Sequence, residues 1–464
     1  MTISTQVPLD GLRATVRGPV VAPDDPGYDE ARTVMYGGLD RRPAALVRAA
    51  DADDVAKVIA FVKENGLELA VRSGGHSAAG HSSTDGGIVL DLRDMKRLEI
   101  DVEARTAWAE TGLTAGEFTS EANRHGLATG FGDTGSVGIG GLTLGGGVGF
   151  LVRKHGLTVD NLLAADIVTA DGDLIRVDAT AHPDLFWAIR GGGGNFGVAT
   201  RFQFRLSPVD RVVAGMLLLP ATARTVAGFV AEAESAPEEL STIANVLNCP
   251  PLPFVPAEFH GNLVIMAQVC YAGDAETGQR VLAPFRGLAT PIADMVQEMP
   301  YPGLFPPEDP DYHPTAVGRT MFVDCIDQDA AQAVVDRLQA SDATLRVAQI
   351  RVLGGAIARV PADATAFAHR SGRIMVNVAA FYDGPEDRTR RQAWVDALTA
   401  DLRQGDDGAY VNFLADEGAG RVRAAYPGRT WDRLAEVKRR YDPTNLFRLN
   451  QNVPPAAAAP APVS

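Results

Sequence analysis

Apolar residues fall at helical spacing in a segment near the N-terminus. They recur at i, i+3, i+4 and i+7, as Val55, Val58, Ile59 and Val62. This spacing predicts an amphipathic helix over residues 52–65, with Asp51 placed to cap its start and Gly66 to end it. The apolar run that follows, at 67–71, predicts a short buried strand.

The alternation of strand and helix continues along the first half of the chain. Apolar and period-two patterns predict strands at 87–92, 106–110, 162–169, 174–177 and 198–206. Ala170-Asp-Gly172 joins two of them as a hairpin. A capping box, Thr114-Ala-Gly-Glu117, begins a helix that runs to His125. A mixture of this kind is typical of an α+β or α/β fold.

The sequence pattern changes near residue 208, and we place a domain boundary there. This predicts a first domain at 1–208 and a second at 209–407. The second shows strand patterns at 212–219, 263–269, 345–352 and 374–381, and helix patterns at 222–233, 274–282, 329–340 and 388–402. A Pro-, Asp- and Tyr-rich loop, 300–314, is placed to cover a site. Residues 1–45 predict an irregular surface lead-in, and residues 454–464 predict a disordered tail.

At 464 residues, 46% hydrophobic and 22% charged, the chain has the composition of a globular protein with two cores. A formal net charge of −15 argues against nucleic acid or an anionic membrane as a partner, because both need a basic face. Three cysteines without a CxxC pair provide no disulfide framework, and no metal-ligand spacing occurs, so we expect no metal. No apolar leader and no apolar run of about 18 residues is visible, which predicts a cytoplasmic protein.

The most informative stretch is Val71-Arg-Ser-Gly-Gly-His-Ser-Ala-Ala-Gly-His-Ser-Ser83, directly after a predicted strand. Its glycines let the backbone approach a ligand closely, and successive free N–H groups in such a turn bind anions. The stretch therefore predicts a pyrophosphate cradle that holds one imidazole, His76. A solvated turn with incidental histidines is the alternative interpretation.

Two further glycine-rich stretches follow, at 130–149 and 191–194. Each begins a formal GxGxxG match, but a Rossmann dinucleotide site needs a helix directly after the glycines. More glycine follows Gly135, which predicts no helix there, and a period-two strand follows Gly197. Close approach to a large, flat, phosphorylated ligand accounts for all three stretches, and FAD is such a ligand.

Four motifs resemble those of the vanillyl-alcohol oxidase superfamily, in its berberine bridge enzyme-like branch. They are Arg72-Ser-Gly-Gly-His-Ser-Ala-Ala-Gly-His-Ser82, Val137-Gly-Ile-Gly-Gly-Leu-Thr-Leu-Gly-Gly-Gly-Val-Gly149, Leu185-Phe-Trp-Ala-Ile-Arg-Gly-Gly-Gly-Gly-Asn-Phe-Gly-Val198 and Tyr441-Asp-Pro-Thr-Asn-Leu-Phe-Arg-Leu-Asn-Gln-Asn452. They occur in the family's order, and the resemblance is weakest in the middle of the chain.

The resemblance implies an α+β, two-domain FAD-binding fold. Residues 1–208 and 408–453 would form the FAD-binding domain, and 209–407 would form an α/β substrate-binding domain with an antiparallel sheet over the flavin ring. The cofactor-binding residues that it implies are Arg72, Ser73, Gly74, Gly75, His76, Ser77, Gly80, His81, Ser82, Asp133, Thr134, Gly135, Val137, Gly138, Gly141, Gly145, Gly147, Gly149, Val198, Asn450 and Asn452.

The resemblance also implies that the 8α carbon of the flavin is bonded to His76, with His81 on the phosphate side. Some relatives add a second link through a cysteine of the second loop. Thr134 occupies that position here, so we expect a single link. Apart from the resemblance, a flavin carbonyl is a candidate acceptor for Asn450 and Asn452, although a polar turn that ends a helix after Asp442-Pro443 is the preferred interpretation of these residues taken alone.

Many members of the family carry Tyr-x-Asn-Tyr before the C-terminal motif, and the last tyrosine acts as base toward a substrate hydroxyl. Here the stretch reads Tyr410-Val-Asn412-Phe413, and a phenyl ring takes no proton. The candidate catalytic residues are therefore Asn412, Tyr382 and Asn377. Tyr382 and Asn377 are five positions apart along one predicted strand, which places them on opposite faces. The missing tyrosine favours amine substrates, because a neutral amine gives up hydride without a strong base.

We expect an FAD-dependent oxidoreductase that transfers hydride from a small organic substrate, such as an alcohol, a sugar or a secondary metabolite, to flavin N5. O₂ is the expected electron acceptor. The alternatives are an amine oxidase of the same fold, a dehydrogenase with another acceptor, and a flavin-binding protein without turnover. The acidic stretch 308–313 would favour neutral or cationic substrates if it lies at the entrance, although an acidic surface loop is the simpler interpretation. The sequence leaves the substrate's identity and the oligomeric state open.

Overall fold

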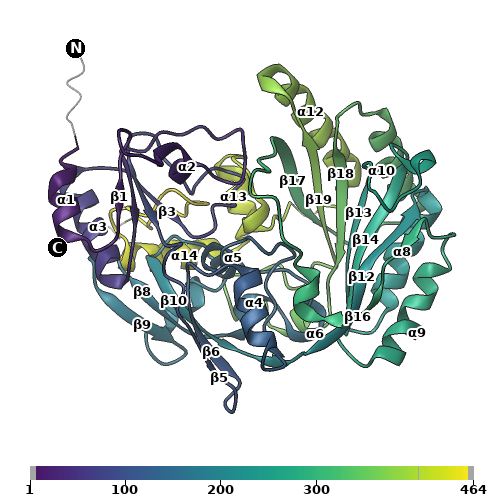
Figure 1. Ribbon diagram of the computed structural model, residues 1–464, viewed down its shortest axis with the longest axis horizontal. Coiled ribbons are helices and arrows are strands. Elements are labelled where there is room, and N and C mark those ends of the chain that lie inside the picture. Colours follow the sequence, from purple (N-terminus) through teal and green to yellow (C-terminus); the bar gives the residue numbers. More distant parts are fainter. Residues whose placement is uncertain (1–6, 406, 458–464) are drawn as a thin grey trace, which may run out of the picture.

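The computed structural model describes residues 7–405 and 407–457 and consists of two halves (Figure 1). One half, on the left in Figure 1, combines the purple and blue N-terminal elements with the yellow C-terminal helices. The other half, in teal and green, is built on one large sheet with helices on its outer face. Helices and mainly antiparallel sheets occur together, which confirms the predicted α+β class.

The left half contains two main sheets. The four-stranded sheet has the order β1-β2-β4-β3 and consists of β1 (Val20–Val21), β2 (Ala45–Arg48), β4 (Ile88–Asp91) and β3 (Leu69–Arg72). The five-stranded sheet has the order β5-β6-β10-β8-β9 and consists of β5 (Leu98–Asp101), β6 (Thr106–Glu110), β10 (Val198–Arg205), β8 (Leu162–Val168) and β9 (Leu174–Asp178). A short pair joins β7 (Leu127–Ala128) to β11 (Ser207–Pro208).

The helices that the N-terminal segment contributes to this half are short apart from one. They are α1 (Leu9–Thr15), α2 (Tyr28–Arg32), α3 (Ala52–Asn65), α4 (Ala115–Asn123), α5 (Ile139–Gly145), α6 (Val152–His155), α7 (Pro183–Ala188) and η1 (Thr158–Asn161). The capping signals of the two longest, α3 and α4, are confirmed. The Asp51 side chain accepts from two backbone N–H groups of α3, Gly66 ends it with φ +62°, and Thr114 and Glu117 form the capping box of α4.

The right half contains an eight-stranded sheet whose pairs are all antiparallel. Its main order is β15 (Ala293–Asp294), β12 (Arg211–Pro220), β14 (Leu263–Tyr271), β13 (Leu240–Asn248), β18 (Arg346–Val352), β19 (Ile374–Phe381) and β17 (Ala316–Val323), with β16 (Gln297–Pro300) also paired to β12. The helices are α8 (Ala223–Ser235), α9 (Ala275–Arg286), α10 (Gln328–Ala340), α11 (Ala356–Arg359) and α12 (Gly384–Leu402), with short turns η2 (Ala257–Phe259) and η3 (Tyr301–Leu304).

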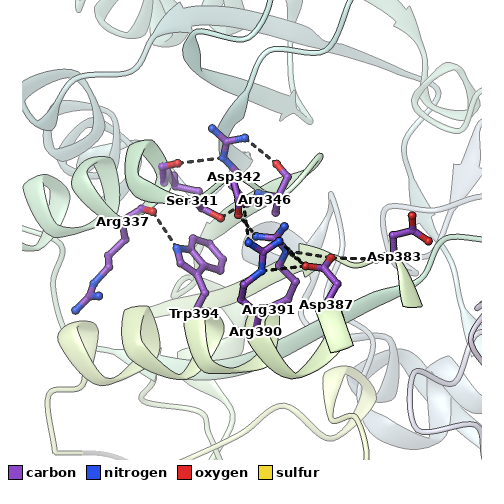
Figure 2. Close-up of polar contacts among 11 residues, drawn as sticks. Arg337, Ser341, Asp342, Arg346, Asp383, Asp387, Arg390, Arg391 and Trp394 are labelled. Carbon is purple, nitrogen blue, oxygen red and sulfur yellow. Dashed lines mark hydrogen bonds and ion pairs between the residues drawn. The ribbon is translucent and has the colours of Figure 1, made fainter. Parts of the chain in front are cut away.

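Helices α8, α9, α10 and α12 pack their apolar faces on this sheet and form one core with it. The longest of them, α12, is held in place by ion pairs as well as by apolar packing (Figure 2). Arg390 and Arg391 both pair with Asp342 in the turn before β18, and both pair with Asp387 one turn earlier in the helix. These hydrogen bonds, that of Arg390 above all, lower the pKa of Asp387 to about 2. The Trp394 ring nitrogen donates to the carbonyl of Arg337 in α10.

Two sequence-based predictions are corrected by the structure, and several strands were not predicted. The lead-in is not irregular, because it contains α1, β1 and α2 and buries Leu12 and Tyr28. The unpredicted strands are β1, β2, β5, β7, β11, β13, β15, β16 and β17. The glycine-rich stretch after Gly135 does contain a helix, α5, although each glycine costs about 1 kcal/mol relative to alanine. Tertiary packing overrides that cost, because Ile139 and Leu144 are buried and the backbone of Gly140 lies against Ser73.

The C-terminal segment returns to the left half through η4 (Val411–Phe413), α13 (Ala419–Ala425) and α14 (Arg429–Tyr441). Its residues Val411, Leu434 and Val453 join the core that lies against the five-stranded sheet. Of the predicted disordered tail, the backbone N–H of Ala456 donates to Ala435, and residues 458–464 lie outside the described range. Within the described residues, no helix is both long and apolar enough to cross a membrane.

Candidate active site

A cavity of about 500 Å³ lies between the two halves. The left half contributes the loop after β3, the stretch 132–148 around α5 and the glycines that precede β10. The right half contributes the inward faces of β17, β18 and β19. Residues 410–415 and 447–451 of the returning segment close the remaining side. A concave site with apolar walls and a few convergent polar groups is typical of a small-molecule site.

The loop after β3 is held open by backbone geometry. Gly75 and Gly80 adopt φ values of +79° and +76°, which side chains other than glycine rarely tolerate. Gly74 lies so close to Gly138 that a Cβ on it would sit 2.2 Å from the Gly138 nitrogen. The Ser73 hydroxyl donates to the Thr111 carbonyl at 2.6 Å and accepts from the Gly140 N–H at 3.3 Å. The first two glycine-rich stretches are therefore fastened to each other and form one wall.

His76 stands on this wall with a defined polar partner. Its Nε2 lies 3.0 Å from the Ser136 hydroxyl, which donates to the Glu308 carboxylate at 2.6 Å. The Ser136 backbone N–H also donates to Glu308, at 3.0 Å. Burial lowers the pKa of His76, and the nearby Glu308 charge opposes that shift only in part. The imidazole is therefore neutral at physiological pH.

The second histidine of the loop is also neutral. Burial, assisted by the positive charge of Arg41, lowers the pKa of His81 to about 4. Its Nε2 has no hydrogen-bond partner within the described part of the chain. His81 lines the same cavity as His76.

The opposite wall carries a polar network that begins on the large sheet. The Gln349 amide donates to Asn245 on the neighbouring strand at 3.0 Å, and its oxygen accepts from Arg351 at 2.8 Å. Arg351 also pairs with Asp133 of the second glycine-rich stretch at 2.5 Å. Asn377 lies directly opposite Gln349 in the β18–β19 pairing. The wall therefore presents neutral amides and one internally paired cation to whatever occupies the cavity.

The returning segment completes the site with aromatic rings. The Tyr410 hydroxyl accepts from the Gly147 N–H and from the Asn412 amide, at 2.8 and 2.9 Å. Burial raises the pKa of Tyr410, although those two donors oppose the shift. Phe413 lies edge-on to Tyr410 and below the Arg351 guanidinium, with 5.2 Å from the ring centroid to that group. Position 413 is thus at the cavity, where a tyrosine would have placed its hydroxyl.

Most of the predicted cofactor-binding residues line the cavity, namely Ser73, Gly74, Gly75, His76, Ser77, His81, Ser82, Asp133, Thr134, Val137, Gly138, Gly141, Val198 and Asn450. Asn377 and Asn412 line it as well. The Asn450 side-chain amide donates to the backbone carbonyls of Gly194 and Phe447. Asn450 can therefore offer a ligand its side-chain oxygen, an acceptor, and not the donor that was predicted.

Seven predicted residues support the walls without lining them: Arg72, Gly80, Gly135, Gly145, Gly147, Gly149 and Asn452. Arg72 is fully buried and donates to the carbonyls of Ser82, Ala31 and Arg32, which ties the loop to the lead-in. Gly149 packs closely against the Phe131 carbonyl. A Cβ added to Gly149 would lie only 2.0 Å from that carbonyl oxygen. The glycines of this group allow close backbone packing, and the Arg72 side chain positions the loop.

Tyr382 is the one predicted catalytic residue that lies away from the cavity lining. It follows β19, its hydroxyl lies against Gly38, and its ring packs at the edge of the right-hand core. Sequence reasoning missed many of the lining residues, among them the polar side chains of Tyr36, Gln349, Arg351 and Gln451. Gln349 and Arg351 had a usable signal, because two polar residues at i, i+2 in an otherwise apolar strand mark one polar face. Tyr36, in the lead-in, had none.

The residues at the cavity fit FAD. Gly141 and Gly194 line it, and a Cβ on either would meet no protein atom within 4 Å, so a side chain there would enter the cavity. The Asn450 side-chain oxygen is buried without a partner among the described residues and is available to a cofactor. Bare backbone on one wall, two neutral imidazoles and an unused amide oxygen suit a flat, polar cofactor.

Comparison with known proteins supports this assignment. Residues 43–178 match the family described as FAD binding domain, and residues 409–454 match that described as berberine and berberine like. The chain is 32% identical to (R)-6-hydroxynicotine oxidase of Paenarthrobacter nicotinovorans over 95% of this chain and 97% of that protein. It belongs to the berberine bridge enzyme-like branch of the vanillyl-alcohol oxidase superfamily.

Solved structures agree with this family. The crystal structure of 6-hydroxy-D-nicotine oxidase from Arthrobacter nicotinovorans superimposes with a TM-score of 0.83 and 30% identity, over 94% of this chain and 98% of that one. Xylooligosaccharide oxidase from Myceliophthora thermophila C1, solved in complex with xylobiose, gives 0.83 at 26% identity, over 97% and 99%. The protein is therefore an FAD-dependent oxidoreductase of the oxidase type that acts on a small organic substrate.

Proposed function

We propose that this protein is an amine oxidase that carries FAD on His76 and uses O₂ as its electron acceptor. When bound, FAD supplies the two-electron chemistry, and the protein binds, orients and shields the substrate. The observation that carries the proposal is Phe413 at the cavity, with Tyr382 outside it. An alcohol must lose its hydroxyl proton as hydride leaves, whereas a neutral amine has a nitrogen lone pair that drives hydride loss without a base.

The attachment to His76 is supported by the state of the imidazole. A nitrogen lone pair is needed to form a bond to carbon, and burial keeps this imidazole neutral. The ring is at the wall of the cavity, beside the glycines that leave room for the cofactor. All three cysteines lie in the right half, so the second link of some relatives has no partner here.

The residues that line the walls favour an uncharged substrate that is partly apolar. The charged lining residues Asp133 and Arg351 neutralise each other, and Gln349 and Asn377 add neutral hydrogen-bonding groups. A relative whose name states hydroxynicotine, (R)-6-hydroxynicotine oxidase, is similar along nearly its whole length. We infer that the amine binds as the free base, because no unpaired carboxylate is among the described lining residues.

Oxidation of an alcohol or a sugar is the second candidate. The amides of Gln349, Asn377 and Asn412 are suited to hydroxyl groups, and xylooligosaccharide oxidase of Thermothelomyces thermophilus is 29% identical over 97% of this chain. In that case another group must take the hydroxyl proton. All three cysteines are free, which suits a reducing compartment, and we also propose a cytoplasmic location, to be tested by fractionating the native cells.

Two measurements test the proposal. Acid precipitation of the purified protein, followed by peptide mapping, should leave the yellow colour in the pellet on the peptide that contains His76. Anaerobic mixing with secondary and tertiary cyclic amines should bleach the flavin absorbance, and air should restore it with release of H₂O₂. Bleaching by oligosaccharides but not by amines would establish the second candidate. Slow recovery in air would indicate a dehydrogenase, and no bleaching with any substrate would indicate a flavin-binding protein without turnover.

A further inference from the structure

The loop that connects η3 to β17 reaches from the right half to the left half. Phe305 at its start packs edge-on against Phe150 and Tyr301, with ring centroids 5.8 and 5.7 Å apart. At its end, the Pro314 carbonyl accepts from the Gly37 N–H at 3.2 Å. Glu308 lies between these anchors, so the loop carries its carboxylate onto Ser136.

The hydrogen bonds of Ser136 have a direction. A carboxylate has only acceptors to offer, so at 2.6 Å the single hydroxyl hydrogen of Ser136 points to Glu308. The backbone N–H of Ser136 donates to the other carboxylate oxygen, and this two-point contact fixes the Glu308 side chain. The hydroxyl therefore turns a lone pair toward His76 Nε2, 3.0 Å away, and that nitrogen must carry the proton. Nδ1 then keeps the lone pair.

We propose that Glu308, acting through the Ser136 hydroxyl, is the positioning residue that fixes His76 as the Nε2–H tautomer and receives that proton when the flavin bond forms. This inference rests on the proposed attachment to His76. It gives a loop of the right half a role in attaching the cofactor to the left half. The attachment then requires this loop to hold Glu308 against Ser136.

The chemistry balances with O₂ as the oxidant. One C–H bond of the 8α methyl group and the imidazole N–H are lost, and an Nδ1–C bond forms. The two protons and two electrons released reduce O₂ to H₂O₂. Without the relay, the neutral ring distributes its proton between both nitrogens, and the Nε2 proton has no carboxylate in line to receive it. Loss of a positioned general base costs about a hundredfold or more in rate.

The test measures the rate at which FAD becomes covalently attached to the full-length chain. The chain is produced in riboflavin-starved cells and then supplied with FAD. Covalent incorporation is read as flavin fluorescence on a denaturing gel and as the intact mass, and non-covalent binding is read separately by fluorescence quenching. Ser136→Ala and Glu308→Gln should bind FAD yet incorporate it at least about a hundredfold more slowly. Ser136→Thr, which keeps the hydroxyl, should restore the rate.

A matched control comes from the same loop. Asp309→Asn removes the same charge one residue further along the loop, where the Asp309 side chain accepts from the Asp311 backbone N–H and makes no contact with Ser136 among the described residues. It should incorporate FAD at the wild-type rate. Equal rates in wild type, Ser136→Ala and Glu308→Gln would overturn the relay while leaving the attachment intact. A wild-type chain that never incorporates FAD covalently would instead overturn the attachment.

The tautomer is measured directly and without turnover. In the FAD-free chain with ¹⁵N-labelled histidine, His76 is assigned by its loss in His76→Ala. The wild-type ring should show a protonated Nε2 and an unprotonated Nδ1, and Ser136→Ala should show a mixture. A protonated Nδ1 in the wild type would overturn the proposal whatever the rates are.

Discussion

Lys438 and Asp442 form an ion pair of 2.7 Å in which neither side chain is exposed. The Lys438 ammonium also donates to the carbonyls of Asn195 and Phe447, and Asp442 accepts from two backbone N–H groups of the same segment. All three ammonium hydrogens are therefore used. The pair joins α14, the third glycine-rich stretch and the C-terminal motif at the end of the cavity.

Replacing Lys438 by methionine should destabilise the protein by about 3–5 kcal/mol, because the Asp442 carboxylate would stay buried without its partner. The measurement is the free energy of unfolding in urea. Arg440→Met, in the same helix, is the control: it breaks an exposed pair with Asp184 and should cost less than about 1 kcal/mol. Similar losses in both variants would contradict the importance assigned to burial.

Two glycines of the second stretch should respond in opposite ways to alanine. Gly149→Ala places a Cβ 2.0 Å from the Phe131 carbonyl and should destabilise the fold by about 3 kcal/mol. Gly141→Ala meets no protein atom within 4 Å but fills cavity space, so it should leave the melting temperature unchanged or higher and lower the FAD content per chain. Thermal unfolding and the flavin-to-protein absorbance ratio check both, and full FAD content in Gly141→Ala would place the cofactor elsewhere.

Phe413→Tyr should shift the substrate preference toward alcohols. The new hydroxyl would stand at the cavity close to the Arg351 guanidinium, whose charge favours the phenolate form that acts as a base. We expect kcat/KM for an alcohol to rise by at least about tenfold, and kcat/KM for an amine to change little. Phe413→Leu, which adds no hydroxyl, is the control. A rise in the leucine variant would show that space, and not a proton acceptor, limits alcohol oxidation.

Acid should destabilise the protein partly through His81. Its pKa is about 4 in the folded state and about 6.5 when unfolded, so between these values the unfolded chain binds a proton that the folded chain does not. The stability contribution is complete above pH 6.5 and is lost as the pH falls toward 4. His81→Asn should therefore lose less melting temperature between pH 7 and pH 5 than the wild type. The exposed His125→Asn should behave like the wild type, and identical slopes in all three would contradict the assignment.

The cofactor loop was accessible to sequence reasoning because its signal is local. Gly75 and Gly80 are glycines for their positive φ values, and the run of small residues around His76 marks close backbone approach. The capping of α3 by Asp51 and Gly66 was predictable for the same reason, since each cap involves residues one turn apart. Helix α5 was not, because propensity argues against it and only the packing of Ile139 and Leu144 forms it.

The amino-acid order by itself determined which residues could hold a flavin and that position 413 lacks a hydroxyl. It did not determine what faces the cavity. Tyr382 and Asn377 belong to one strand pattern, but only the pairing of β19 with β18 places Asn377 opposite Gln349 at the cavity, with Tyr382 beyond the strand end. Likewise, Glu308 meets Ser136 across 172 positions of sequence. Contacts between distant segments depend on how the two halves pack, and no local pattern encodes that packing.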